Sequence, residues 1–245
     1  MIVVQKESRI DEVGAQFLHH PHVLASKKML ERKRVLLNPG DLPIGNVGFI
    51  RAALNQLGKQ LPAPNDYPTS LLPHLHRKVW KSTLGEALES IGSFVKPAER
   101  LKSFTGFVMD YDYSMHTQGA SLRQPVWVSE RVQFVSEHRY YVINRNIATC
   151  GVAVEGPIPD FLTVVKAVRD FKDGPANYAI DFGVLSTGET ALIEVNAALG
   201  ALGLYEGADP ETYLEFLHAG WVEHGQKLRV GTSKPATDPS TLGEI

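Results

Sequence analysis

The stretch from Tyr178 to Asn196 constrains the fold of this chain more than any other. It contains two short β-type runs around Ser-Thr-Gly-Glu, which predicts a β-hairpin with Thr187-Gly188 as its two-residue tip. With that tip, Asp181 lies directly opposite Glu194, and Asn196 lies on the same face two positions further along. The hairpin is therefore predicted to carry two carboxylates and an amide on one face.

The opposite face of the hairpin is apolar and suited to a protein core. The side chains expected there are Ile180, Phe182, Val184, Ala191, Ile193 and Val195.

The polar face allows two interpretations. Directly opposed carboxylates repel each other by about 0.2–1 kcal/mol, and a divalent cation would turn that repulsion into a binding site. A few hard oxygen ligands suit Mg²⁺ that shares its other positions with water and phosphate. Alternatively, the face is a solvated strand surface, where carboxylates are common. The hairpin alone does not decide between them.

Composition limits the classes of protein to consider. The chain has 245 residues, 43% of them hydrophobic, which suits one large globular domain or two small ones. A net charge of −2 gives no support for binding to nucleic acid or to an anionic membrane. Cys150 is the single cysteine, which excludes an internal disulfide and fits a reducing compartment. Without a membrane-length apolar run or a signal peptide, we expect a soluble cytoplasmic protein.

Residues 1–74 are predicted to form a small α/β region of irregular structure. A strand is expected at Val35–Leu37, and Asn46 is expected to cap a helix at Val47–Leu57. Four prolines between Pro62 and Pro73 mark a linker. This region lacks the glycine-rich motifs of Rossmann and P-loop nucleotide sites.

Residues 75–230 are predicted to form the main domain, and residues 231–245 a disordered tail. The helices expected in the main domain run from Ser82 or Thr83 to Ile91, from Asp160 to Phe171 and from Glu211 to His224.

Two short segments of the main domain suit phosphate binding. Lys96 ends a strand at Pro97, where its charge would be fixed beside a nucleotide, although a strand leaving the core gives the same pattern. The segment from Lys102 to Gly106 holds small residues ahead of another strand, and such a loop can bind phosphates through its N–H groups. An ordinary turn is the alternative for this loop.

Taken in order, these fragments resemble the ATP-grasp superfamily, and most closely the small ATP-grasp domain proteins related to RimK-type ligases. The resemblance covers residues 75–207, and it rests on Phe94–Pro97, Lys102–Gly106, Ser129–Val132, Glu137–Arg139 and Asp181 with Glu194–Asn196. It implies an α+β ATP-grasp fold, in which two subdomains joined by a hinge near 129–136 grip ATP.

The resemblance also implies a role for individual residues. It implies nucleotide contacts from Lys96, Lys102, Thr105, Gly106, Glu130, Val132, Glu137 and Arg139, a catalytic role for Arg139 and Lys102, and Mg²⁺ ligation by Asp181, Glu194 and Asn196. One further basic residue is expected among Arg77, Lys78 and Lys81, which the sequence does not separate.

The implied activity is that of an ATP- and Mg²⁺-dependent carboxylate–amine ligase, which forms an amide bond through an acyl phosphate. Its partner would be a small molecule or peptide with a carboxylate and an amine. Phosphoryl transfer needs positioning and charge neutralisation rather than a protein nucleophile, which agrees with the lack of a convincing triad.

Two alternatives remain. Asp181-Phe182-Gly183 matches a protein-kinase metal motif, but Tyr140 stands where a kinase carries its base, and no glycine-rich loop precedes Lys96. A non-catalytic nucleotide-binding or scaffolding module of the same fold is the second alternative. The presence of both carboxylates and the amide favours an enzyme, and Mg²⁺-dependent ATP turnover would separate the two.

Overall fold

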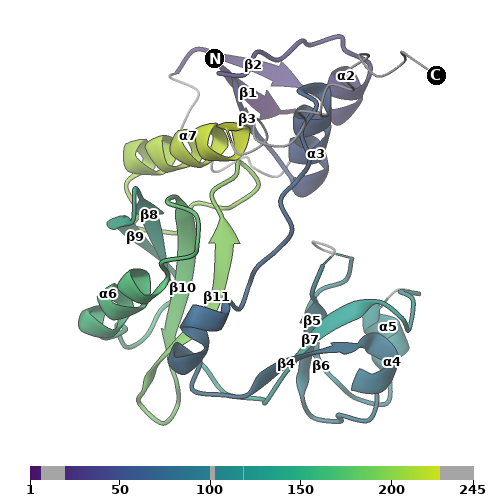
Figure 1. Cartoon of the computed structure of the whole chain (residues 1–245), viewed down its shortest axis with the longest axis vertical. Coiled ribbons are helices and arrows are strands. Elements are labelled where there is room, and N and C mark those ends of the chain that lie inside the picture. The colour runs from purple at the N-terminus through teal and green to yellow at the C-terminus, as the bar shows by residue number, and fades with distance from the viewer. Residues whose placement is uncertain (7–19, 100–102, 118, 227–245) are drawn as a thin grey trace, which may run out of the picture.

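A computed structural model describes residues 1–6, 20–99, 103–117 and 119–226, and folds them into three β-sheets flanked by helices (Figure 1). This mixed architecture confirms the predicted α+β class. The elements are β1 (Ile2–Gln5), β2 (His22–Ala25), α2 (Lys27–Glu31), β3 (Leu42–Ile44), α3 (Val47–Gln56), η1 (Thr69–His74), β4 (Val79–Thr83), α4 (Leu84–Ala87), β5 (Phe94–Pro97), β6 (Phe107–Val108), α5 (Tyr113–Thr117), β7 (Pro125–Ser129), β8 (Glu137–Ile143), β9 (Asn146–Val154), α6 (Phe161–Asp170), β10 (Tyr178–Val184), β11 (Thr190–Ala197) and α7 (Pro210–Gln226).

The N-terminal sheet is parallel, with β1 between β2 and β3. The Asn46 side chain caps α3 by accepting a hydrogen bond from the Phe49 N–H at 3.0 Å, as predicted. The strand expected at Val35–Leu37 is wrong, because that segment is irregular and Leu36 is exposed. The third strand is β3 instead, which contains Pro43. An edge strand tolerates proline, since one side of its backbone needs no partner.

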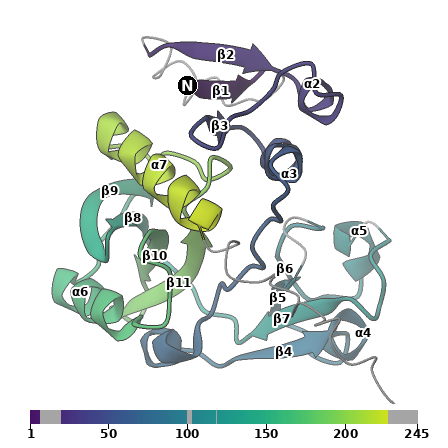
Figure 2. The same ribbon diagram turned by 45° about the horizontal axis from the view of Figure 1, so that its top comes forward.

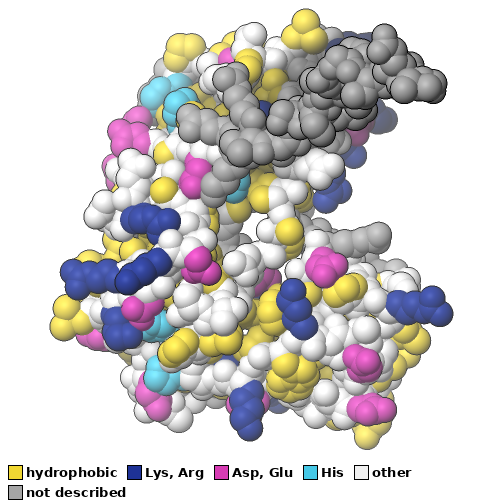
Figure 3. Space-filling model, viewed as in Figure 1, with side chains coloured by type: hydrophobic (Ala, Val, Ile, Leu, Met, Phe, Trp, Pro, Cys, Tyr) yellow, Lys and Arg dark blue, Asp and Glu magenta, His cyan; other side chains and the backbone are white. Residues whose placement is uncertain are grey.

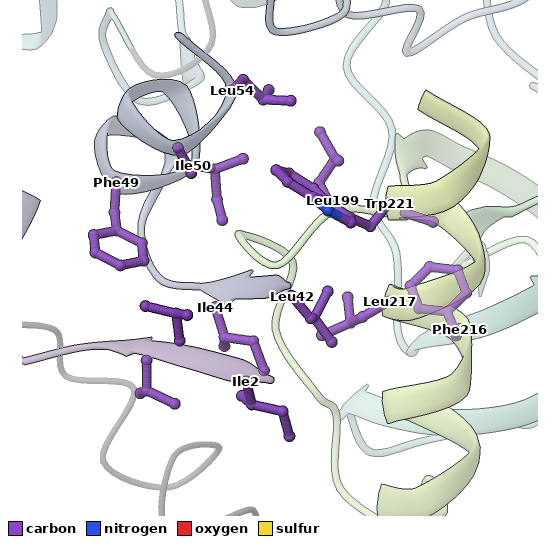
Figure 4. Close-up of a cluster of buried hydrophobic side chains, with 14 of the residues drawn as sticks. Ile2, Leu42, Ile44, Phe49, Ile50, Leu54, Leu199, Phe216, Leu217 and Trp221 are labelled. Carbon is purple, nitrogen blue, oxygen red and sulfur yellow. The ribbon is translucent and has the colours of Figure 1, made fainter. Parts of the chain in front are cut away.

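One hydrophobic core joins the N-terminal sheet to the C-terminal helix (Figure 4). Leu42 from β3 and Ile50 from α3 lie in the same cluster as Leu217 and Trp221 from α7. The core therefore contains residues from both sides of position 74. The domain boundaries derived from the sequence remain a prediction, and residues 231–245 lie outside the described part.

The small sheet has the order β4-β7-β5-β6 and is antiparallel. Val95, Val126 and Val128 point into its own core under α4. Because side chains alternate along strands, Lys96 and its cross-strand partner Trp127 point the other way. The helix expected to reach Ile91 is shorter, since α4 ends at Ala87 and a turn at Gly92, with φ of 86°, leads into β5.

The large sheet has the order β11-β10-β8-β9, with α6 packed beside it. The predicted pairing of Asp181 with Glu194 is confirmed. The two-residue tip is wrong, because the last pair is Val184 with Thr190 and five residues lie between them. A β-bulge after Asp181 restores the register by setting Phe182 opposite Leu192. Leu192 therefore takes the core position that was expected for the next residue, Ile193, which is only half-buried.

Two connections join the sheets. Residues 130–136 link the small sheet to the large one. Residues 61–66, here called the strap, belong to the link between α3 and η1, which descends beside β11 (Figures 1 and 2). The backbone oxygen of Asp66 accepts a hydrogen bond from the Val195 N–H at 3.0 Å, which ties the strap to the outer edge of β11. Within the described residues, no helix combines the length and apolarity needed to cross a membrane.

Candidate functional site

The polar face of the hairpin carries the three side chains predicted to bind metal. The Asn196 Nδ2 atom donates to Asp181 Oδ2 at 3.2 Å and to Glu194 Oε1 at 2.9 Å. Asp181 is only 1% exposed and the Glu194 side chain 30% exposed, so the face is largely withdrawn from solvent. The structure brings the three residues together, and their role as metal ligands remains a prediction.

Arg139 forms a buried ion pair with Asp181, because β8 and β10 set the two residues opposite each other. Its guanidinium donates through Nε to Oδ1 at 2.8 Å and through Nη2 to Oδ2 at 2.7 Å. The Tyr205 ring centroid lies 4.0 Å from the guanidinium carbon, a cation–π contact. Burial raises the pKa of Asp181 to about 6, although the Arg139 hydrogen bonds oppose that rise. Asp181 is therefore mainly ionised at neutral pH.

Lys96 brings a second cation to the hairpin from the small sheet. Its Nζ lies 2.6 Å from Glu194 Oε2 and 3.0 Å from Asp66 Oδ2, and 4.5 Å from the ring centroid of Tyr67. Burial alone would lower the pKa of Lys96, but Glu194, Tyr67 and Asp66 outweigh it and raise the pKa. The ammonium is therefore permanently charged.

The two carboxylates that contact Lys96 are shifted in opposite directions. Burial raises the pKa of Asp66 in spite of Lys96. Burial also acts to raise the pKa of Glu194, but there the closer Lys96 ammonium outweighs it and the pKa is lowered. Asn196 and Arg139 also lower the pKa of Glu194, whereas the nearby Glu194 charge raises that of Asp66. Glu194 makes the shorter contact and is the principal partner of Lys96.

These cations correct one expectation from the sequence. The opposed carboxylates Asp181 and Glu194 do not stand as an uncompensated repulsive pair, since Arg139 neutralises the first and Lys96 the second. Asp181 and Glu194, both predicted Mg²⁺ ligands, thus form ion pairs with Arg139 and Lys96, which were predicted to contact phosphate. Within the described part of the chain, no three His, Cys, Asp or Glu side chains gather as a metal site, so the candidate set is two carboxylates and one amide.

The segment from Ser103 to Gly106 leads into β6, and Gly106 lies beside Phe94 and Lys96 of β5. A Cβ atom on Gly106 would lie 2.5 Å from the Phe94 ring and 3.2 Å from the Lys96 Cβ, so a larger residue here would have to displace that ring. Phe104 anchors the segment in the core of the small sheet, while Thr105 is exposed. Lys102 lies outside the described residues, and its predicted role remains a prediction.

The structure gives different surroundings to Arg77, Lys78 and Lys81, which the sequence could not tell apart. The Arg77 guanidinium donates to the backbone oxygens of Leu75 at 3.0 Å, Leu192 at 2.7 Å and Ile193 at 3.1 Å, and to Ser129 Oγ at 3.1 Å. Its donors are therefore engaged in joining the small sheet to β11.

Both lysines are exposed, and Lys78 lies beside the link between the sheets, with Nζ 4.0 Å from Glu130 Oε1. Lys81 is the cross-strand neighbour of Trp127, and its Nζ lies 5.1 Å from the Trp127 ring centroid. Trp127 stands between Lys81 and Lys96 in the sheet register, so all three share one face.

The remaining predicted nucleotide contacts fall into two places. Glu130 and Val132 lie on the link between the sheets, and the Glu130 carboxylate accepts from the Lys78 N–H at 2.9 Å. The structure gives neither of them a contact with the hairpin cluster. Glu137 lies nearer that cluster, because its Oε1 accepts from the Tyr205 hydroxyl at 3.2 Å.

The kinase-like motif gains no support from its setting. Asp181, Phe182 and Gly183 lie within the continuous strand β10, where Phe182 is fully buried. A Cβ on Gly183 would meet the Ser136 carbonyl oxygen at 2.3 Å, so this glycine serves close packing.

Three residues of the site were missed from the sequence: Asp66, Tyr67 and Tyr205. Asp66 and Tyr67 stand between the prolines of the expected linker, where an acid beside an aromatic residue is a weak signal. Their importance comes from tertiary contacts to Lys96, which no local pattern encodes.

Comparisons with known proteins agree with this architecture. A family model of the ATP-grasp domain, described as family 2 of one of the ATP-grasp clades, matches residues 74–216. The D-alanine–D-alanine ligase from Bacillus anthracis is similar in structure, with a TM-score of 0.56 at 15% identity over 92% of this chain and 98% of that one. The same enzyme complexed with ATP gives a TM-score of 0.52 at 13% identity, over the same shares.

A RimK domain ATP-grasp protein from Sphaerobacter thermophilus DSM 20745 gives a TM-score of 0.48 at 16% identity, over 91% of this chain and 98% of that one. No curated protein matches the chain. At these identities the two D-alanine–D-alanine ligase structures are evidence of a shared fold alone. The family model confirms the resemblance drawn from the sequence.

Proposed function

Because the chain belongs to the ATP-grasp domain family, we propose that it is an ATP- and Mg²⁺-dependent carboxylate–amine ligase. The observation that carries the proposal is the contact of Lys96, from the small sheet, with Glu194 on the hairpin at 2.6 Å. It brings a fixed cation from one sheet to a carboxylate of the other, as a site that grips a nucleotide phosphate and its metal requires.

We assign the nucleotide to the space between the small sheet and the hairpin. Lys96 and Lys81 offer charge to the phosphates, and the glycine at position 106 lets the preceding loop lie close to them. Lys102 and Thr105 would contact the phosphates from that loop, and the hinge residues Glu130 and Val132 would border the adenine. Figure 3 shows the surface hollowed between the small-sheet lobe and the upper part of the molecule.

The hairpin residues fit Mg²⁺ by their chemistry, since they offer hard oxygen donors in small number. Asp181, Glu194 and Asn196 would hold the ion, which supplies charge neutralisation at the phosphates. Asn196 turns its Nδ2 toward both carboxylates here. Ligation through its Oδ1 therefore requires the amide to rotate, and Glu194 has to exchange Lys96 for the ion.

The proposed reaction has two steps. A substrate carboxylate oxygen attacks the γ-phosphorus of ATP, the bond to the bridging oxygen breaks, and ADP leaves. The substrate amine then attacks the acyl carbon, phosphate leaves with the bonding electrons, and the amine loses its proton to water. Arg139 neutralises charge on the acyl phosphate from its fixed position on β8, while the loop ending at Gly106 excludes water.

The test is release of ADP from MgATP in the presence of amino acids supplied as carboxylate and amine. We expect release that needs Mg²⁺ and is lost in Lys96→Met and in Glu194→Gln. Binding of MgATP without ADP release under any of these conditions would favour the non-catalytic module instead. No binding of MgATP at all would contradict both.

A further inference from the structure

A cavity of about 550 Å³ lies against the hairpin cluster and is covered by the strap. Residues of the strap form one wall, and residues 194–197 with residues 199–205 form the other. Phe171 and Tyr178 lie at the end away from Arg139. Small-molecule sites in proteins typically span about 300–1,000 Å³, so the cavity has the size of a ligand site.

The nucleotide does not account for this cavity. Among the described residues that line it, none comes from the small sheet, which carries Lys96 and the loop at 103–106. The lining does include Arg139, Glu194 and Asn196. The cavity therefore reaches the reacting groups from the side opposite to the proposed nucleotide site.

The cavity is polar at one end and apolar along its length. Arg139 and Glu194 supply opposite charges at the polar end. Leu61, Pro62 and Pro64 of the strap face a second apolar wall that includes Leu199 and Leu202. A ligand that fits has a charged head and a large apolar body, because burying apolar surface is favourable by about 25 cal/mol per Å².

Tyr178 closes the far end with apolar surface. Its residue is 1% exposed, and its ring packs edge-on against Phe171 with the two ring centroids 4.9 Å apart. Because side chains alternate along β10, the ring lies on the same face as Ile180 and Phe182, and its hydroxyl is withdrawn from the cavity.

We propose that this cavity binds the non-nucleotide substrate of the ligase, an amino acid with a large apolar side chain. The head of the amino acid lies at Arg139 and Glu194, and its side chain lies between the strap and residues 199–205. This inference rests on the proposed function, whose substrate class it specifies.

The first test is calorimetric titration of the full chain with four probes, alone and with Mg²⁺ and a non-hydrolysable ATP analogue. The probes are L-tyrosine, L-phenylalanine, glycine and L-glutamate. We expect the two aromatic probes to bind about tenfold or more tightly than glycine and L-glutamate, because only they bury apolar surface along the length of the cavity. Equal affinity for all four, or no binding under either condition, would overturn the proposal.

A pair of glycine variants tests the cavity itself. A Cβ on Gly203, which lines the cavity beside Arg139, meets no atom within 4 Å, and the same holds for Gly40 outside the cavity. Gly203→Leu should weaken L-tyrosine binding at least tenfold, while Gly40→Leu should not change it. Equal effects of the two would overturn the proposal. Aromatic binding without any ADP release would instead contradict the ligase and leave the cavity assignment standing.

Discussion

The Lys96 ammonium lies 2.6 Å from the Glu194 carboxylate, and this contact joins the small sheet to the large sheet. The proposed phosphate ligand is thus bound to the proposed metal ligand before either has met its own partner. In the proposed complex with MgATP the two have to separate together, so binding of the phosphate and binding of the ion would be coupled. Asp66 shares the ammonium and would therefore compete with the nucleotide.

Lys96→Met should abolish MgATP binding and also destabilise the protein. Removing the ammonium leaves the Glu194 and Asp66 carboxylates buried without their cation, and breaking a buried ion pair costs about 3–5 kcal/mol. Because burial raises the pKa of Asp66, protonation at lower pH should relieve part of that loss. Denaturant unfolding at pH 7.5 and pH 5 measures both effects, and Lys78→Met, at an exposed lysine, is the control. A Lys96→Met protein that binds MgATP normally would contradict the assignment.

Asp66→Asn should raise the affinity for MgATP by about 3- to 10-fold, on the scale of one charge-assisted hydrogen bond. The change removes one of the two carboxylates that hold Lys96, while Glu194 keeps the ammonium in place. Calorimetric titration with MgATP measures the change. Weaker binding would show instead that Asp66 helps to hold the nucleotide or its ion.

Mg²⁺ affinity should fall about tenfold per pH unit below pH 6, because Asp181 has to be ionised to act as a ligand. Its folded pKa is raised to about 6 from an unfolded value of about 3.9, so the folded protein holds this proton more tightly. The stabilisation that this bound proton gives the folded state is therefore fully present below about pH 4 and is lost as the pH rises through 6. The Mg²⁺ affinity changes in the opposite direction, because it increases over the same pH range. Titrations with Mg²⁺ and a fixed ATP analogue from pH 5 to pH 8 check the first statement. An affinity constant across that range would exclude Asp181 as a ligand.

Arg77→Met should lower the free energy of unfolding by about 1.5–3 kcal/mol without changing the Kd for MgATP in the folded protein. Its guanidinium holds the Leu192 and Ile193 carbonyls rather than facing the proposed nucleotide site. Lys81→Met should show the reverse, with weaker MgATP binding and unchanged stability, since its side chain is exposed beside Trp127. Urea unfolding and calorimetry on both variants separate the two roles. A loss of MgATP affinity in folded Arg77→Met would contradict the structural role.

The sequence was informative where neighbours along the chain decide the geometry. The helix expected from Asp160 to Phe171 is present as α6, and the Asp160 carboxylate caps it by accepting from the Thr163 N–H at 2.9 Å. The pairing of Asp181 with Glu194 was also predicted, although for a reason that is partly wrong. The longer loop shifts the register by one residue and the bulge shifts it back, so two unforeseen features cancel.

The partners of the charged groups could not be read from the sequence. Lys96 meets an acid 30 positions before it and another 98 positions after it, and only the packing of the sheets brings them together. The N-terminal sheet was misread for a related reason. Pro43 argues against a strand unless the strand is known to lie at an edge, which is a property of the folded sheet.

The strap has a consequence for how copies of the protein behave toward one another. The edge strand β11 would present free N–H and C=O groups, and such edges pair readily with strands of other molecules. The Asp66 oxygen takes the Val195 N–H and Arg77 takes two carbonyls of the same edge. The segment that covers the proposed substrate cavity therefore also protects the monomer from edge-to-edge aggregation, so any motion that lifts it to admit a ligand exposes a surface prone to self-association.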